Sequence, residues 1–76
     1  MTKSQALAQA VKATEAAHPD WSYEKVTGFY AGFEVGFDGE PASVTEASHP
    51  EWSYDKVTGF YAGFAAGTEA RGERWS

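Results

Sequence analysis

Residues 26–33 read VTGFYAGF, and the same eight residues return unchanged at positions 57–64. The similarity begins earlier in each copy: between 14–33 and 45–64, an offset of 31 residues, three of twenty positions differ. The three differences are conservative: Ala17/Ser48, Asp20/Glu51 and Glu24/Asp55. Internal repeats of this kind mark a duplicated structural unit, so both copies are expected to fold in the same way. We expect a single domain over 1–76, with internal repeats at 14–40 and 45–71.

Glycines recur every fourth residue in both copies, at Gly28, Gly32 and Gly36 and at Gly59, Gly63 and Gly67. On an α-helix, a step of four residues advances a position by only about 40° around the axis. These glycines therefore form a stripe without side chains, bordered by a sector that contains Phe29 and Phe33, or Phe60 and Phe64. The spacing predicts that all six are helix-packing residues, where a second backbone can come close.

A β-strand is the alternative for this segment, because valine, phenylalanine and tyrosine favour strands and glycine disfavours helices by about 1 kcal/mol relative to alanine. In a strand, however, neighbouring Phe29 and Tyr30 would point to opposite faces, and the glycines would define neither face. The alternation that marks a half-buried strand is missing. The pattern therefore favours helices over both copies.

Start and stop signals divide the rest of the chain into further helices. Ser4 is a candidate N-cap for a first helix, and the His-Pro pairs at 18–19 and 49–50 should each end a helix, since the residue before proline avoids the α region. The long helices should begin with the proline itself or with Ser22 and Ser53 as N-caps. A turn at 38–41 and a short helix near 41–48 complete the chain. The predicted fold is all-α: two tandem helical hairpins forming a small pseudo-symmetric four-helix domain.

Composition limits the classes of function. The chain has 76 residues, no cysteine and a net charge of −5, so disulfides and thiolate zinc sites are excluded. Nucleic acid is not expected as a partner, because phosphate binding depends on clustered Lys and Arg; imitation of nucleic acid by the acidic surface stays open. The apolar run at 26–37 is too short to span a membrane and contains Glu34. The start lacks the apolar stretch of a signal peptide, so a cytoplasmic location is expected.

Four aromatic residues near the starts of the long helices are candidate partner-binding residues: Trp21, Tyr23, Trp52 and Tyr54. Aromatic side chains are frequent anchors of protein interfaces. The alternative is that they belong to the core, as we expect for Phe29, Phe33, Phe60 and Phe64. Duplication places the four at equivalent corners of a two-fold arrangement, which indicates a surface with two equivalent contact sites.

Catalytic and metal-binding patterns are not found in the sequence. His18 and His49 could bind zinc only if the fold brought them together with Glu15 and Glu46, and no HExxH spacing is present. Ser22 and Ser53 suit capping rather than nucleophilic catalysis, and the glycine-rich segments lack the Lys-Ser/Thr of a phosphate loop. We therefore expect no catalytic residue, no metal and no cofactor.

In general character the chain resembles small helical proteins of phages and mobile elements, which carry aromatic and glycine residues at this spacing in their helices. The resemblance covers the two long helices. It implies a compact accessory protein that binds and inhibits a host or defence enzyme. The sequence therefore predicts a small non-enzymatic protein-binding module. The alternative is a structural homo-oligomer, such as a homodimer, that assembles through its glycine and aromatic helix faces.

Overall fold

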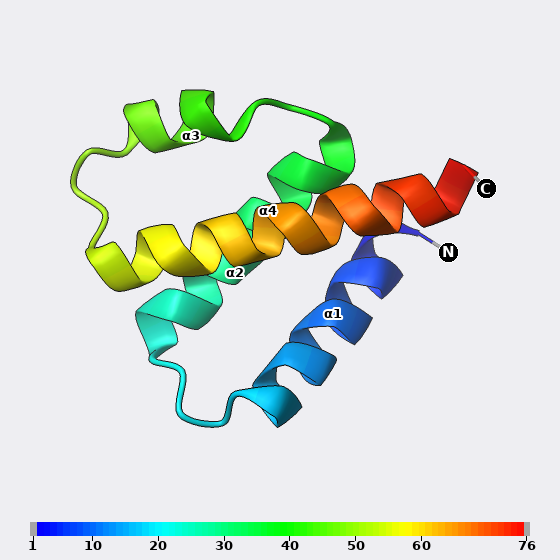
Figure 1. Cartoon of the computed structure of the whole chain (residues 1–76), viewed down its shortest axis with the longest axis horizontal. Helices are drawn as coiled ribbons and strands as arrows, with labels where there is room; N and C mark the ends of the chain where they lie inside the picture. Colours follow the sequence, from blue (N-terminus) through cyan, green and yellow to red (C-terminus); the bar gives the residue numbers. More distant parts are fainter. Residues whose placement is uncertain (1, 76) are drawn as a thin grey trace.

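The computed structural model describes residues 2–75 and, for their side chains, residues 2–72. Four helices and no strand occupy this part of the chain: α1 (Lys3–Ala17), α2 (Tyr23–Asp38), α3 (Ala42–Ser48) and α4 (Tyr54–Trp75) (Figure 1). The predicted all-α, four-helix fold is confirmed. None of the helices in the described part combines the length and apolar character needed to cross a lipid bilayer.

Local hydrogen bonds explain where each helix begins. Thr2, not Ser4, is the N-cap of α1: its Oγ1 accepts from the backbone N–H of Gln5 at 3.1 Å, and the Gln5 side chain accepts from the Thr2 N–H at 3.0 Å. This reciprocal capping box satisfies two amides at the helix start, which Ser4, already inside the first turn, is placed too late to do. The prediction of Ser4 as the cap is wrong by two residues.

The other predicted helix boundaries, at the starts of α2 and α4 and at the ends of α1 and α3, agree with the structure. Ser22 accepts a hydrogen bond from the Lys25 N–H at 3.2 Å at the start of α2, and Ser53 caps α4 in the same way; the alternative start at the prolines is wrong. His18 and His49 are the C-cap residues of α1 and α3. Gly39 ends α2 at φ 78°, a left-handed conformation that glycine adopts without a steric penalty from a Cβ.

Helices α2 and α4 run parallel and pack through their glycine stripes. A Cβ on Gly28 would lie 2.1 Å from the Lys56 carbonyl oxygen, on Gly32 it would lie 1.8 Å from that of Phe60, and on Gly36 2.3 Å from that of Phe64. Successive glycines along α2 thus meet successive residues along α4, which shows that the two helices run in the same direction. The stripe of α4 faces α2 equally closely, and a Cβ on Gly63 would lie 2.0 Å from the Phe29 carbonyl oxygen. Side chains would force the two backbones apart.

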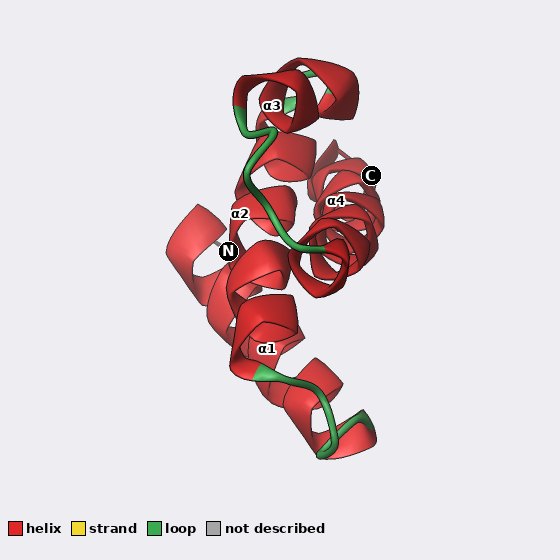
Figure 2. Cartoon of the chain, turned by 90° about the vertical axis from the view of Figure 1, so that its left-hand side faces the viewer, coloured by secondary structure: helices red, strands yellow, loops and turns green. Residues whose placement is uncertain are grey.

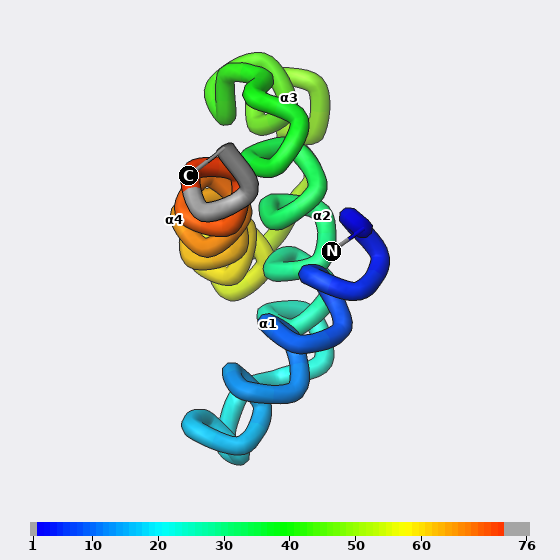
Figure 3. Tube along the Cα trace, turned by 90° about the vertical axis from the view of Figure 1, so that its right-hand side faces the viewer, coloured from blue at the N-terminus to red at the C-terminus, as the bar shows by residue number. Residues whose placement is uncertain are grey.

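Helices α1 and α3 lie on opposite sides of this parallel pair (Figures 2 and 3). α1 covers the aromatic side of α2, where Phe29, Phe33 and Phe37 form the core with Ala6 and Val11. α3 has 7 residues against the 15 of α1, and every one of them keeps part of its surface exposed. By the offset of 31, α3 aligns with residues 11–17 of α1, so residues 3–10 have no helical counterpart in the second copy and the two hairpins are unequal.

Candidate functional site

The starts of α2 and α4 lie side by side and are joined by two equivalent hydrogen bonds. Ser22 Oγ, besides capping its own helix, donates to the Asp55 carboxylate of α4 at 3.1 Å. Ser53 Oγ donates in return to the Glu24 carboxylate of α2 at 3.0 Å. Each carboxylate also lies in the first turn of its helix, where the helix dipole favours negative charge. The repeated segments therefore meet at one end of the molecule.

Both tryptophans are held in stacks that attach the loops to the core. The His18 ring stacks on Trp21 with centroids 4.8 Å apart, the Lys25 ammonium lies 5.0 Å from the Trp21 centroid, and Trp21 contacts the Phe29 ring at 6.2 Å. The second copy repeats this stack with centroid distances of 4.5, 5.1 and 5.4 Å, between His49 and Trp52, Lys56 and Trp52, and Trp52 and Phe60. Trp21 and Trp52 are half-buried and position the loops.

The tyrosines close to these tryptophans in sequence are far more exposed to solvent than the tryptophans. Tyr23 is 75 % exposed and Tyr54 is 78 % exposed, although each is the first residue of a helix that is packed along its length. By helical periodicity, both lie on the side of their helix opposite the glycine stripe, so they face outward on opposite flanks of the pair. Of the four predicted partner-binding residues, the two tyrosines are exposed and the two tryptophans are half-buried.

Two further tyrosines extend this surface and were missed as candidate site residues. Tyr30 and Tyr61 are 42 % and 43 % exposed and lie seven residues, or two helical turns, after Tyr23 and Tyr54. That spacing is visible in the sequence and could have identified them. Tyr61 donates a hydrogen bond from its hydroxyl to the Glu46 carboxylate of α3, and this bond raises the pKa of Tyr61 above its ordinary value of 10.0. It joins α3 to α4.

Carboxylates surround the exposed tyrosines. We define the end face as the exposed prolines, tyrosines and carboxylates in the loops and first turns at this end: Pro19, Asp20, Tyr23, Glu24, Pro50, Glu51, Tyr54 and Asp55. The pKa of Glu51 is lowered from its ordinary value of 4.5, first by a hydrogen bond from its own backbone N–H and then by His49, whose Nδ1 lies 3.2 Å from the carboxylate. The end face is thus aromatic and negatively charged at neutral pH.

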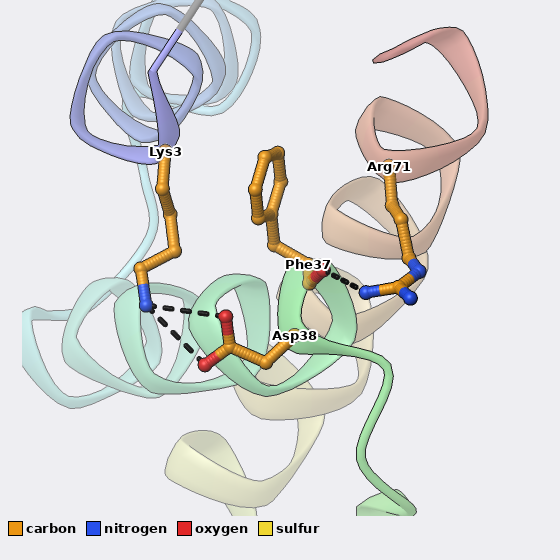
Figure 4. Close-up of polar contacts among 4 residues, drawn as sticks. All are labelled: Lys3, Phe37, Asp38 and Arg71. Carbon is orange, nitrogen blue, oxygen red and sulfur yellow. Dashed lines mark hydrogen bonds and ion pairs between the residues drawn. The ribbon is translucent and has the colours of Figure 1, made fainter. Parts of the chain in front are cut away.

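The opposite end of α2 carries polar contacts that close the fold. Lys3 of α1 pairs with the Asp38 carboxylate at 3.3 Å, and Arg71 of α4 donates to the Phe37 carbonyl oxygen at 2.9 Å (Figure 4). Arg71 thereby satisfies a carbonyl at the C-terminus of α2, where a cation is favourable. The sequence gives neither contact an equivalent in the other copy, because Lys3 aligns with Glu34 and Arg71 aligns with Glu40.

A shallow groove of about 260 Å³ lies between α1 and α4. It is lined by Ala6, Gln9, Ala10, Phe33, Ala66, Glu69 and Ala70. Its volume falls below the roughly 300–1,000 Å³ that is usual for small-molecule sites. In the part of the chain that the structure describes, histidines and carboxylates do not gather in groups of three or more that could hold a metal ion.

Comparisons of the chain with protein-family models, with curated proteins and with solved structures gave no match. The end face, with its two exposed tyrosines, is therefore the candidate site on geometric grounds alone.

Proposed function

We propose that this chain is a non-enzymatic protein-binding module that contacts its partner through the end face. The observation that carries the proposal is the exposure of Tyr23 and Tyr54 on a rigid support, with each helix start fixed by a serine cap and a tryptophan stack. Tyrosine rings bring apolar area and a hydroxyl to an interface at low cost in side-chain entropy. A rigid pair of such rings is suited to act as anchors.

The charge around the tyrosines supports a basic surface on the partner. The end face contributes the carboxylates of Asp20, Glu24, Glu51 and Asp55, while the nearby ammonium groups of Lys25 and Lys56 are held over the tryptophan rings. Complementary charge across an interface accelerates association and selects the partner. We therefore propose a partner that presents arginine or lysine beside pockets for the two tyrosine rings.

Inhibition of a host or defence enzyme is the biological role that we propose for this module. The support for it is the compact acidic fold and the general resemblance to small helical proteins of phages and mobile elements. Such an inhibitor would act in the cytoplasm and would need no cofactor of its own. An acidic end face that enters a basic cleft would block access to that cleft, as imitation of nucleic acid would do.

Self-assembly through the glycine and aromatic helix faces is less well supported. The glycine stripes of α2 and α4 face each other within one chain, so they are already covered. Phe29, Phe33 and Phe37 are buried beneath α1. The glycine faces are therefore not free for a homo-oligomer, which would have to assemble through the exposed tyrosines of the aromatic faces.

Capture experiments with the double variant Tyr23→Ala and Tyr54→Ala test the proposal. The intact tagged chain, bound to a support, is incubated with cytoplasmic extract of its native host, and the retained proteins are quantified. We expect the double variant to lose a specifically retained protein at least about tenfold, with unchanged helicity by circular dichroism, since losing an anchor costs on the order of 2 kcal/mol or more. Val44→Ala, on exposed α3, is the matched control. Equal retention by both variants would exclude the end face as the binding surface.

A further inference from the structure

We propose that the junction between Asp38 and Gly39 is a site of spontaneous chemical modification, at which aspartate converts to isoaspartate, and that the fold slows this conversion. The proposal is independent of the end face and of its partner. It rests on the sequence at the C-terminus of α2 and on the contacts that the two reacting groups make there.

Asp38 and Gly39 form the only aspartate-glycine pair in the chain, and the sequence contains no asparagine. The backbone nitrogen of the residue after an aspartate can attack the carboxyl carbon of that aspartate. Glycine allows this attack best, because it has no side chain to hinder the approach. The other two aspartates, Asp20 and Asp55, are followed by tryptophan and lysine, whose side chains hinder it. The chain therefore has one position at which the reaction is favoured.

The reaction closes a cyclic imide and then opens it with water. A bond forms between the Gly39 nitrogen and the Asp38 carboxyl carbon, while one carboxyl oxygen leaves as water with the amide proton and the carboxyl proton. Hydrolysis of the imide at the side-chain carbonyl restores aspartate. Hydrolysis at the main-chain carbonyl gives isoaspartate, in which the main chain runs through the side-chain carbon atoms of residue 38. Water is the only co-reactant.

The Gly39 nitrogen is engaged in the hydrogen bonds that end α2. Its N–H donates to the Gly36 carbonyl oxygen at 3.1 Å, and the N–H of Glu40 donates to the Val35 carbonyl oxygen at 3.1 Å. These two bonds form a Schellman motif around Gly39, whose φ of 78° is left-handed. Because the nitrogen has to release its hydrogen in order to react, this motif has to open first.

The Asp38 carboxylate is directed at α1 by an ion pair. Lys3 Nζ donates to both of its oxygens at 3.3 Å, and Figure 4 shows the carboxylate pointing toward Lys3. While this pair is intact, the carboxyl group is not free to turn to the Gly39 nitrogen. Arg71 adds a restraint on the neighbouring residue, because it donates to the Phe37 carbonyl oxygen at 2.9 Å. The conversion therefore requires a local opening of the last turn of α2.

Isoaspartate would in turn change the contacts at this end of α2. It lengthens the main chain before Gly39 by one carbon atom and leaves a carboxylate attached directly to the Cα atom of residue 38. The Schellman motif and the ion pair with Lys3 both depend on the original spacing. The modified chain should therefore lose the polar link between α1 and α2.

Peptide mapping of the intact chain after incubation at neutral pH tests the proposal. Mass spectrometry with electron-transfer fragmentation distinguishes isoaspartate from aspartate, and Asp20 and Asp55 are internal controls. We expect isoaspartate at Asp38 to accumulate at least about tenfold faster in guanidinium chloride, where the chain is unfolded, than in the folded chain. In the folded chain, Lys3→Ala should accelerate the conversion about two- to fivefold. Lys3→Arg, which keeps the pair, and Lys12→Ala, an exposed lysine of the same helix, should leave the rate unchanged.

Circular dichroism verifies that each variant folds. Sodium chloride at about 1 M, which shortens the Debye length to about 3 Å, weakens the Lys3 pair in the wild-type chain and should give the same acceleration if Lys3→Ala does not fold. Equal rates in the folded and unfolded chain would overturn protection by the fold. Unchanged rates in folded Lys3→Ala and at high salt would overturn the role of the ion pair. Absence of isoaspartate at Asp38 in the unfolded chain would exclude the modification site.

Discussion

Glycine recurs in α2 and α4 although it is unfavourable in the interior of a helix. Each glycine costs about 1 kcal/mol relative to alanine in a helix interior, and each long helix carries three of them in its stripe. Close contact between the two backbones offsets this cost. A Cβ on each of these glycines would lie 1.8–2.3 Å from a carbonyl oxygen of the other helix. Dense contact between two backbones gains dispersion energy along their whole shared length.

Adding one methyl group to this interface should therefore destabilise the fold. We expect Gly32→Ala and Gly63→Ala each to lower the free energy of unfolding by about 1–3 kcal/mol or more, because the backbones have to separate to relieve the overlap. Urea denaturation followed by circular dichroism measures the change. Gly72→Ala is the control: a Cβ there would meet no heavy atom within 4 Å in the described part of α4, so it should raise stability by up to about 1 kcal/mol. Neutral substitutions at Gly32 and Gly63 would contradict the close approach.

At the scale of the helices, the sequence predicts most boundaries because they depend on local chemistry. Ser22, Ser53, His18 and His49 act at the predicted positions, since caps and proline effects are determined by neighbours in the chain. The error at Ser4 is also local, because the capping box of Thr2 and Gln5 is visible in the sequence. The partial burial of Trp21 could not be predicted from such local signals. It depends on Phe29 and on the path of the loop.

The hydrogen bond between Tyr61 and Glu46 should control how firmly α3 is held. The folded pKa of Tyr61 is raised above 10.0, so the contribution of this bond is complete below pH 10.0 and is lost as the pH rises through the raised pKa. We expect Tyr61→Phe to accelerate amide hydrogen exchange in α3 several-fold at neutral pH, while exchange in α2 and α4 changes little. Tyr30→Phe, at the equivalent position of α2, is the control. Unchanged exchange in α3 would show that other contacts hold this helix.

For the whole molecule, the repeat predicts two equivalent units but leaves their relative direction open. Parallel and antiparallel packing both bring two glycine stripes together, and the choice depends on how α3 and its loops return the chain to the start of α4. The parallel arrangement places Tyr23 and Tyr54 at one end, which creates the end face. The inequality of the two hairpins follows from a difference in length, because α1 has more than twice the residues of α3.

This inequality makes stability depend far more on α1 than on α3. Val11 is 5 % exposed within the core and Val44 is 60 % exposed on α3. Val11→Asp buries a charge without a partner, which costs about 3–5 kcal/mol, a large share of the roughly 5–15 kcal/mol that stabilises a folded domain. We expect thermal denaturation to show a clearly lowered melting temperature for the Val11→Asp variant. Val44→Asp, by contrast, should change stability by no more than about 0.5 kcal/mol. Equal losses in the two variants would mean that α3 covers the aromatic side of α4 as tightly as α1 covers that of α2, and the two hairpins would then contribute equally to the fold.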